Sequence, residues 1–272
     1  MPATRTDSNL LAPFTLTNFL TAFKAAMDDA GYSAPFDEFG SNNENIVFEY
    51  NFDSTSAKGK AYLKATVAFD SSARTVTISQ NFYDSWDTSA DTGSNASTTY
   101  TSPAFSVDSQ IFFTAISHPE VRLVIVMQGA SLYHFGLIRP ANMPKFWNDN
   151  YKNSRLYAFI PEDSNLKSFK GLAAAGTPYN SASNSLMWTM ATLQTANDLI
   201  GATPLPEMLV SPFLMAPINF GTNGQFSNEI AITASTGMPR LQSISVVNGG
   251  TTDKWLLLTN TPDNGFAIKM VP

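Results

Sequence analysis

Short runs of alternating apolar and polar residues, separated by turn-forming residues, recur along most of this chain. In the run at residues 46–52, the isoleucine, tyrosine and phenylalanine side chains share one face, and Glu49 and Asn51 fall on the other. Because neighbouring side chains of a β-strand point to opposite faces, this period predicts half-buried strands. Further strands are expected at residues 61–69, 74–82, 121–128, 132–138, 243–247, 254–259 and 266–271.

Turn-forming residues join these strands into hairpins. Residues 70–72 separate the strands at 61–69 and 74–82, and Gly129 separates the next pair. Near the C-terminus, an Asn-Gly-Gly sequence at 248–250 and a Pro-Asp-Asn-Gly sequence at 262–265 predict a three-stranded meander. Residues 186–193 fit a helix nearly as well as a strand, and we interpret them as a strand.

One segment has the period of a helix. Between residues 16 and 30 the apolar side chains are Leu16, Phe19, Leu20, Phe23, Met27 and Ala30. Thr15 or Thr17 can cap its N-terminus, and Gly31 can end it. Such a stripe is typical of core packing, and the alternative is a face that binds a partner.

The pattern as a whole predicts an α+β fold: a mostly antiparallel β-sheet or sandwich with one N-terminal helix packed on it, and long loops. Residues 1–12 lack the apolar core of a signal peptide and are interpreted as an N-terminal arm. Residues 13–272 are expected to form a single β-rich domain, and a division into two lobes near residues 140–153 stays open. With 43% hydrophobic residues, a chain of 272 residues can bury a substantial core.

Three segments are expected to be loops: residues 85–99, 141–153 and 203–224. The last is apolar but interrupted by prolines, which exclude long regular structure. It either packs over its own sheet or forms an arm that docks on a neighbouring subunit.

Composition disfavours several classes of function. The chain has no cysteine, two histidines and 14% charged residues, so common catalytic and metal-binding side chains are scarce. A net charge of -6 without a basic cluster argues against nucleic-acid binding. The longest apolar stretch, residues 123–127, is far shorter than the roughly 18 residues of a membrane span. We therefore expect no nucleic-acid partner, no membrane partner and no cofactor, and favour a structural or binding role over catalysis.

Several segments match parts of known chemical motifs. Asp91 begins an Asp-Thr-Gly-Ser sequence like the catalytic loop of aspartic proteases. That chemistry needs two such loops, and this chain has one copy, in a polar tract. Only a homodimer could supply the second copy. His118 and His134 lack the spacing of a zinc pair; we interpret His118 as a turn residue and His134 as a sheet or core residue. Asp84, Asp87 and Asp91, with Ser89 and Asn95, are interpreted as a solvated acidic loop rather than a calcium site. Dispersed glycosidase carboxylates carry no local signature and stay open.

Several short sequences carry a likeness to known proteins: GLIRP at 136–140, PKFWN at 144–148, YAFIP at 157–161, FSNEI at 226–230, GMP at 237–239, WLLL at 255–258 and GFAI at 265–268. They resemble segments of virion structural proteins of tailed bacteriophages. The resemblance implies a component of the neck, tail or baseplate that associates with itself in a symmetric assembly and with other virion proteins. It implies a location in the virion, after assembly in the host cytoplasm, and no catalytic residues.

Large apolar residues in the expected loops are the candidate interface of such a subunit: Phe146, Trp147, Tyr151, Met208, Phe213 and Met215. For the three aromatic residues Phe146, Trp147 and Tyr151, an equal alternative is that they cap the core of their own chain. The alternative function is a glycan-binding adhesin or receptor-binding tail module, in which Trp147 or Trp86 stacks on sugars. A glycan hydrolase that uses dispersed carboxylates is a third hypothesis.

Overall fold

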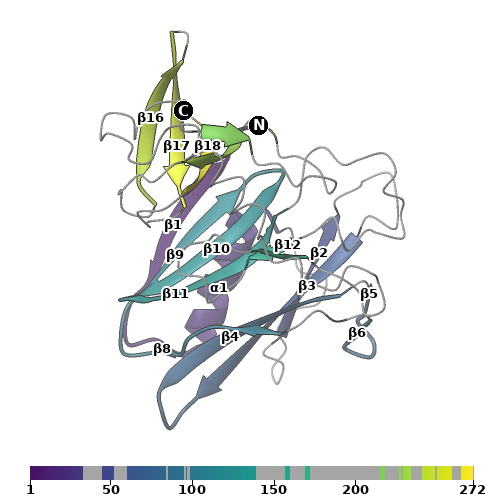
Figure 1. Cartoon of the computed structure of the whole chain (residues 1–272). Helices are drawn as coiled ribbons and strands as arrows, with labels where there is room; N and C mark the ends of the chain where they lie inside the picture. Colours follow the sequence, from purple (N-terminus) through teal and green to yellow (C-terminus); the bar gives the residue numbers. More distant parts are fainter. Residues whose placement is uncertain are drawn as a thin grey trace.

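Within the residues that the structure describes, antiparallel β-sheets and one N-terminal helix make up the regular structure (Figure 1), as the sequence predicts. The structure is a computed structural model. It describes residues 1–32, 45–51, 60–83, 85–94, 96, 99–138, 157–159, 169–171, 215–217, 227, 229–233, 241–248, 250–258 and 265–271.

The first sheet has six strands in the order β1-β9-β10-β11-β12-β13. These are β1 (Thr4–Leu10), β9 (Ile111–Ser117), β10 (Val121–Gln128), β11 (Ser131–Ile138), β12 (Tyr157–Phe159) and β13 (Phe169–Gly171). The predicted β10–β11 hairpin is confirmed, and Gly129 in its turn has a φ of 57°. Most residues of the segment interpreted as an N-terminal arm form β1, an edge strand paired with β9 along its full length.

The second sheet contains β2 (Asn45–Asn51), β3 (Lys60–Asp70), β4 (Thr75–Tyr83), β7 (Tyr100–Thr101) and β8 (Phe105–Ser106). The predicted β3–β4 hairpin is confirmed. The expectation that residues 85–99 form only a loop is wrong, because β5 (Ser85–Asp87) and β6 (Thr92–Ser94) pair as a small hairpin. Trp86 explains the difference: its side chain is buried and its ring packs edge-on against Tyr83, at 5.1 Å between centroids.

The third sheet has the order β14-β15-β18-β17-β16. Its strands are β14 (Met215–Pro217), β15 (Ile230–Thr233), β16 (Ser243–Asn248), β17 (Thr251–Leu257) and β18 (Gly265–Met270). The predicted C-terminal meander is confirmed as β16, β17 and β18. The prediction that residues 203–224 form only a loop is wrong at β14, which pairs with β15. Proline lacks a backbone N–H, but an edge strand tolerates Pro217 because one side of its backbone makes no hydrogen bonds to another strand.

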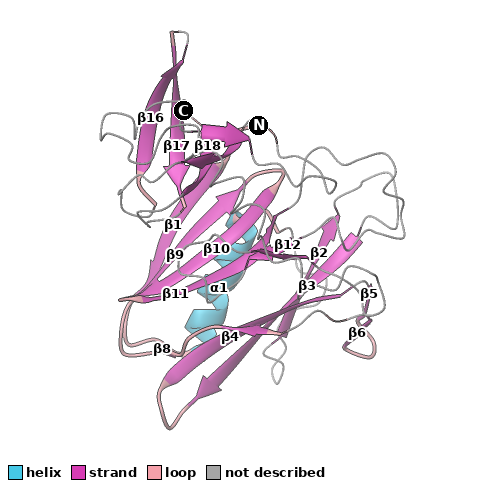
Figure 2. Cartoon of the chain, viewed as in Figure 1, coloured by secondary structure: helices cyan, strands magenta, loops and turns pink. Residues whose placement is uncertain are grey.

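Helix α1 (Leu16–Asp29) confirms the helical pattern and its core role. Thr15 is the N-cap and forms a capping box with Asn18, while Gly31 takes a φ of 87° just after the helix. Figure 2 shows α1 lying against the sheet that contains β9 and β10. Its buried face joins that sheet through ring contacts, including Phe23 with Phe135 at 5.2 Å between centroids. The stripe therefore serves the core rather than a partner.

A buried side chain connects the first two sheets. Gln80 of β4 donates from Nε2 to the backbone oxygen of His134, at 3.2 Å, and accepts from the Gly136 N–H, at 3.3 Å. Its amide thus satisfies a donor and an acceptor of β11, as a neighbouring strand would. Within the described residues, no helix has the length and hydropathy needed to cross a membrane.

Candidate functional site

The residues predicted to form an interface fall mostly outside the described part of the chain. Phe146, Trp147, Tyr151, Met208 and Phe213 all lie there, as does the segment at 186–193. Met215 is the first residue of β14. The interface role of these six residues stays a prediction.

The Asp-Thr-Gly-Ser sequence belongs to the exposed β5–β6 hairpin. Asp91 lies in its turn with a φ of 49°, and a Cβ atom at Gly93 would come within 2.2 Å of the Tyr83 ring. The glycine therefore serves close packing against an aromatic ring. This setting differs from an aspartic protease loop, whose carboxylate is held between apolar strands.

The Asp87 carboxylate supports the same turn. Its Oδ1 accepts hydrogen bonds from the Ser89 hydroxyl, at 2.6 Å, from the Ser89 N–H, at 2.9 Å, and from the Ala90 N–H, at 3.3 Å. These hydrogen bonds, led by that from the Ser89 hydroxyl, lower the pKa of Asp87. Asp84 and Asn95 lie outside the described residues, and the interpretation of this loop as solvated rather than ion-binding stays a prediction.

Trp86 offers little surface to a sugar. It is 7% exposed, and the Lys64 ammonium lies over its ring at 4.9 Å from the centroid. The glycan-binding alternative consequently depends on Trp147, outside the described residues.

His118, Glu120 and Glu229 come together where the β9–β10 turn meets the third sheet. One potential ligand atom from each lies within 4.8 Å of the others, and His118 and Glu120 are buried. The Ser227 N–H donates to Glu120 at 2.9 Å. A hydrogen bond from the Met1 amino group is the main cause that lowers the pKa of Glu229, with weaker contributions in the same direction from Ser227 and His118, while burial opposes them.

The hydrogen bond at Nδ1 determines which ring nitrogen of neutral His118 carries the proton. Its Nδ1 accepts from the Glu120 N–H at 3.1 Å, so the neutral ring carries its proton on Nε2, which lies 3.7 Å from a Glu229 oxygen. A metal bound at Nε2 would instead require the ring proton on Nδ1. That proton would face the Glu120 N–H, and the hydrogen bond to Nδ1 would be lost. The predicted turn position of His118 is confirmed by its backbone, which donates to Val121 O at 2.9 Å and accepts from the Val121 N–H at 3.2 Å. His134 is fully buried in β11, as its alternating pattern predicts.

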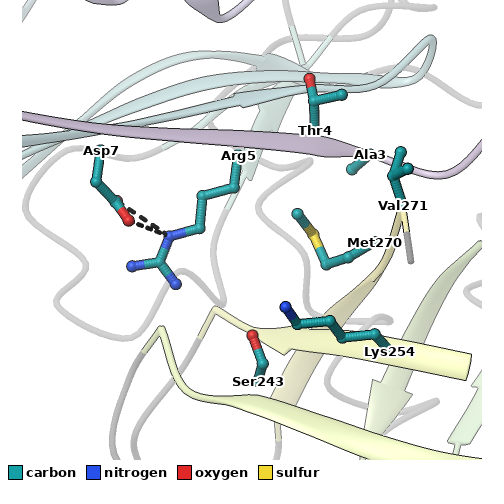
Figure 3. A pocket seen from close by; sticks show the side chains of 8 residues that line it. All are labelled: Ala3, Thr4, Arg5, Asp7, Ser243, Lys254, Met270 and Val271. Carbon is teal, nitrogen blue, oxygen red and sulfur yellow. Dashed lines mark hydrogen bonds and ion pairs between the residues drawn. The ribbon is translucent and has the colours of Figure 1, made fainter.

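A pocket of about 480 Å³ lies between β1 and the third sheet (Figure 3). Its lining residues are Ala3, Thr4, Arg5, Asp7, Ser243, Lys254, Met270 and Val271. The volume falls in the range of small-ligand sites. Two of the lining residues, Arg5 and Lys254, are cationic, although the net charge of the chain is -6.

Backbone pairing holds the two walls of this pocket together. Ala3 donates to Lys269 O at 2.7 Å and accepts from the Val271 N–H at 2.9 Å. Arg5 donates from Nη1 to Leu241 O at 2.7 Å, just before β16. Sequence reasoning missed the pocket because its walls come from opposite ends of the chain.

The free edge of β16 is a second feature that sequence reasoning missed. Within the described chain, β16 pairs with β17 alone, and its Val247 is 68% exposed. Figure 1 shows β16 and β17 extending as a hairpin at the periphery of the molecule. The sequence signal was the uncharged run SISVVN, which contains neither lysine nor proline.

Comparison of the chain with protein-family models finds no match, and comparison with curated proteins finds none either.

Proposed function

We propose that this protein is a non-enzymatic structural subunit of a phage particle, in the neck, tail or baseplate. It associates with copies of itself and with other virion proteins, without nucleic acid, membrane or cofactor, and its location is the virion. The observation that carries the proposal is the uncharged free edge of β16.

The hydrogen-bond pattern of the β16–β17 hairpin determines which amides face outward. Leu257 donates to Gln242 O at 2.9 Å, and the same register continues along β16. Because antiparallel partners alternate between bonded and non-bonded pairs, the amides of Ser243, Ser245 and Val247 point away from β17. They have no hydrogen-bond partner among the described residues and form a row of donors for an added strand.

The edge of the first sheet is different. Strand β1 carries Arg5 and Asp7, whose side chains form an ion pair at 2.8 Å. Charged side chains on an edge strand hinder pairing with another chain, whereas β16 has none. Of these two edges, that of β16 is therefore the better suited to docking.

Strand addition suits a subunit that assembles into a symmetric particle. Each added backbone hydrogen bond contributes about 1 kcal/mol net, and several such bonds act together along one edge. Repetition of the contact around a symmetry axis multiplies a modest affinity. The segments that resemble phage virion proteins, and the aromatic-rich composition, support the same proposal.

Two lysine variants test it. Val247→Lys adds a charge to the free edge, and we expect it to abolish self-association. Thr252→Lys is the matched control, because Thr252 is exposed and pairs with Val247 but lies on the inner strand β17. Sedimentation velocity and thermal melts of both variants provide the measurement. Equal self-association of wild type and Val247→Lys, at equal thermal stability, would contradict the proposal.

A further inference from the structure

The charges of the pocket between β1 and the third sheet are unbalanced. Among its eight lining residues, Arg5 and Lys254 are cationic and Asp7 is the one acid. Asp7 is already engaged: it binds Arg5 Nε at 2.8 Å and accepts from the Thr114 hydroxyl at 2.7 Å. One positive charge, on Lys254, is left over.

Three polar groups of the pocket have hydrogen-bonding capacity to spare. Arg5 uses Nε and Nη1 for Asp7 and Leu241, so Nη2 is available among the described contacts. Neither the Lys254 ammonium nor the Ser243 hydroxyl makes a hydrogen bond or ion pair with any described residue. Figure 3 shows both groups pointing into the pocket on the side where the Arg5 guanidinium lies. Two cations and a hydroxyl on one side suit a carboxylate.

The remaining wall suits an aliphatic stem rather than a sugar ring. Ala3, Met270 and Val271 supply apolar surface, and none of the eight lining residues is aromatic. Sugars stack preferentially on aromatic faces, whereas the methylene groups of a glutamate need only an apolar wall. The lining therefore favours an acidic side chain over an acidic glycan.

The position of Ser243 connects the pocket with the docking edge. Ser243 lines the pocket, is the first residue of β16, and has an amide on the free edge. A strand that adds to β16 thus passes the pocket. We infer that the pocket receives the carboxylate of a glutamate from the extended protein segment that adds to β16, an inference that rests on the proposed function.

Two peptides distinguish binding in the pocket from binding along the edge of β16. The probes are blocked pentapeptides, Thr-Val-Glu-Val-Thr and its glutamine counterpart, titrated into the full-length protein by isothermal calorimetry. We expect the glutamate peptide to bind about tenfold more tightly, the effect of one charge-assisted hydrogen bond. Lys254→Gln should abolish this difference while leaving weak binding of both peptides.

Lys269→Gln is the matched control. Lys269 lies in the same sheet, where it pairs with Asp253 at 2.9 Å, and it does not line the pocket. The control variant should keep the tenfold preference. Val247→Lys should weaken the binding of both peptides equally, since it changes the edge of β16 and not the pocket.

The outcomes distinguish the two proposals. Equal binding of the two peptides to wild type, with self-association still lost in Val247→Lys, would overturn the pocket inference and leave the proposed function standing. Binding of the glutamate peptide that needs Lys254 but has the same affinity in wild type and Val247→Lys would support a carboxylate pocket and contradict docking on β16. Binding of free glucuronic acid that depends on Lys254, without binding of either peptide, would overturn the inference in favour of an acidic glycan.

Discussion

At the scale of single residues, Gly136 shows how tightly the first sheet constrains its backbone. It lies in β11 with a φ of 142°, and an added Cβ would come within 2.1 Å of the Arg122 oxygen. An alanine here would meet both a strained backbone and a backbone atom that cannot move aside.

We expect Gly136→Ala to lower the free energy of unfolding by about 3 kcal/mol. Gly129→Ala is the control: its φ is also positive, at 57°, but nothing lies within 4 Å of the added atom. That variant should lose about 1 kcal/mol. Urea unfolding of both variants is the measurement, and equal losses would show that the contact with Arg122 is unimportant.

Asp87 leads to a prediction about pH. Hydrogen bonds from Ser89 and Ala90 lower its pKa in the folded state. Its stabilising effect is therefore fully present above the pKa of the unfolded chain and is lost as pH falls through the lower, folded pKa. Ser89→Ala should raise the pKa of Asp87 towards its ordinary value. Carboxyl carbon NMR titration measures this, and an unchanged pKa in the variant would refute the role of the hydroxyl.

At the scale of elements, local patterns predicted most of the structure where the signal itself is local. The capping threonine and Gly31 bound α1, and Gly129 marks a hairpin, because caps and turns depend on a few adjacent residues. Strand β1 was missed because the run TRTDSNL has polar residues on both faces. Its strand conformation comes from pairing with β9, about a hundred residues away, which no local pattern encodes.

The link between the first two sheets gives a prediction at this scale. Gln80→Leu keeps the side-chain volume but removes both hydrogen bonds to β11, so we expect a loss of about 2 kcal/mol in unfolding free energy. The neighbouring Ser79→Ala removes only an exposed hydrogen bond with Thr101, and should change it by less than about 0.5 kcal/mol. Chemical denaturation compares the two. A neutral Gln80→Leu would mean that apolar packing alone joins these sheets.

At the scale of the whole molecule, the candidate site could not be predicted from the sequence. Arg5 and Lys254 come from opposite ends of the chain and become neighbours because Ala3 pairs with β18. Neither residue belongs to a motif, so only the fold reveals their proximity. The edge of β16 was partly predictable. The sequence shows that residues 243–248 carry no charge, but whether a strand is internal or at an edge depends on the order of strands in the sheet.

Hydrogen–deuterium exchange on the assembled protein and on the Val247→Lys variant tests the central claim most directly. The claim is that assembly adds a strand to β16, which would place the outward amides of Ser243, Ser245 and Val247 in new hydrogen bonds. We predict slow exchange across residues 243–248 in the assembled wild type and fast exchange of the outward amides in the variant, with β10 equally protected in both. Assembly that leaves the outward amides of β16 exchanging as fast as in the variant would contradict the account.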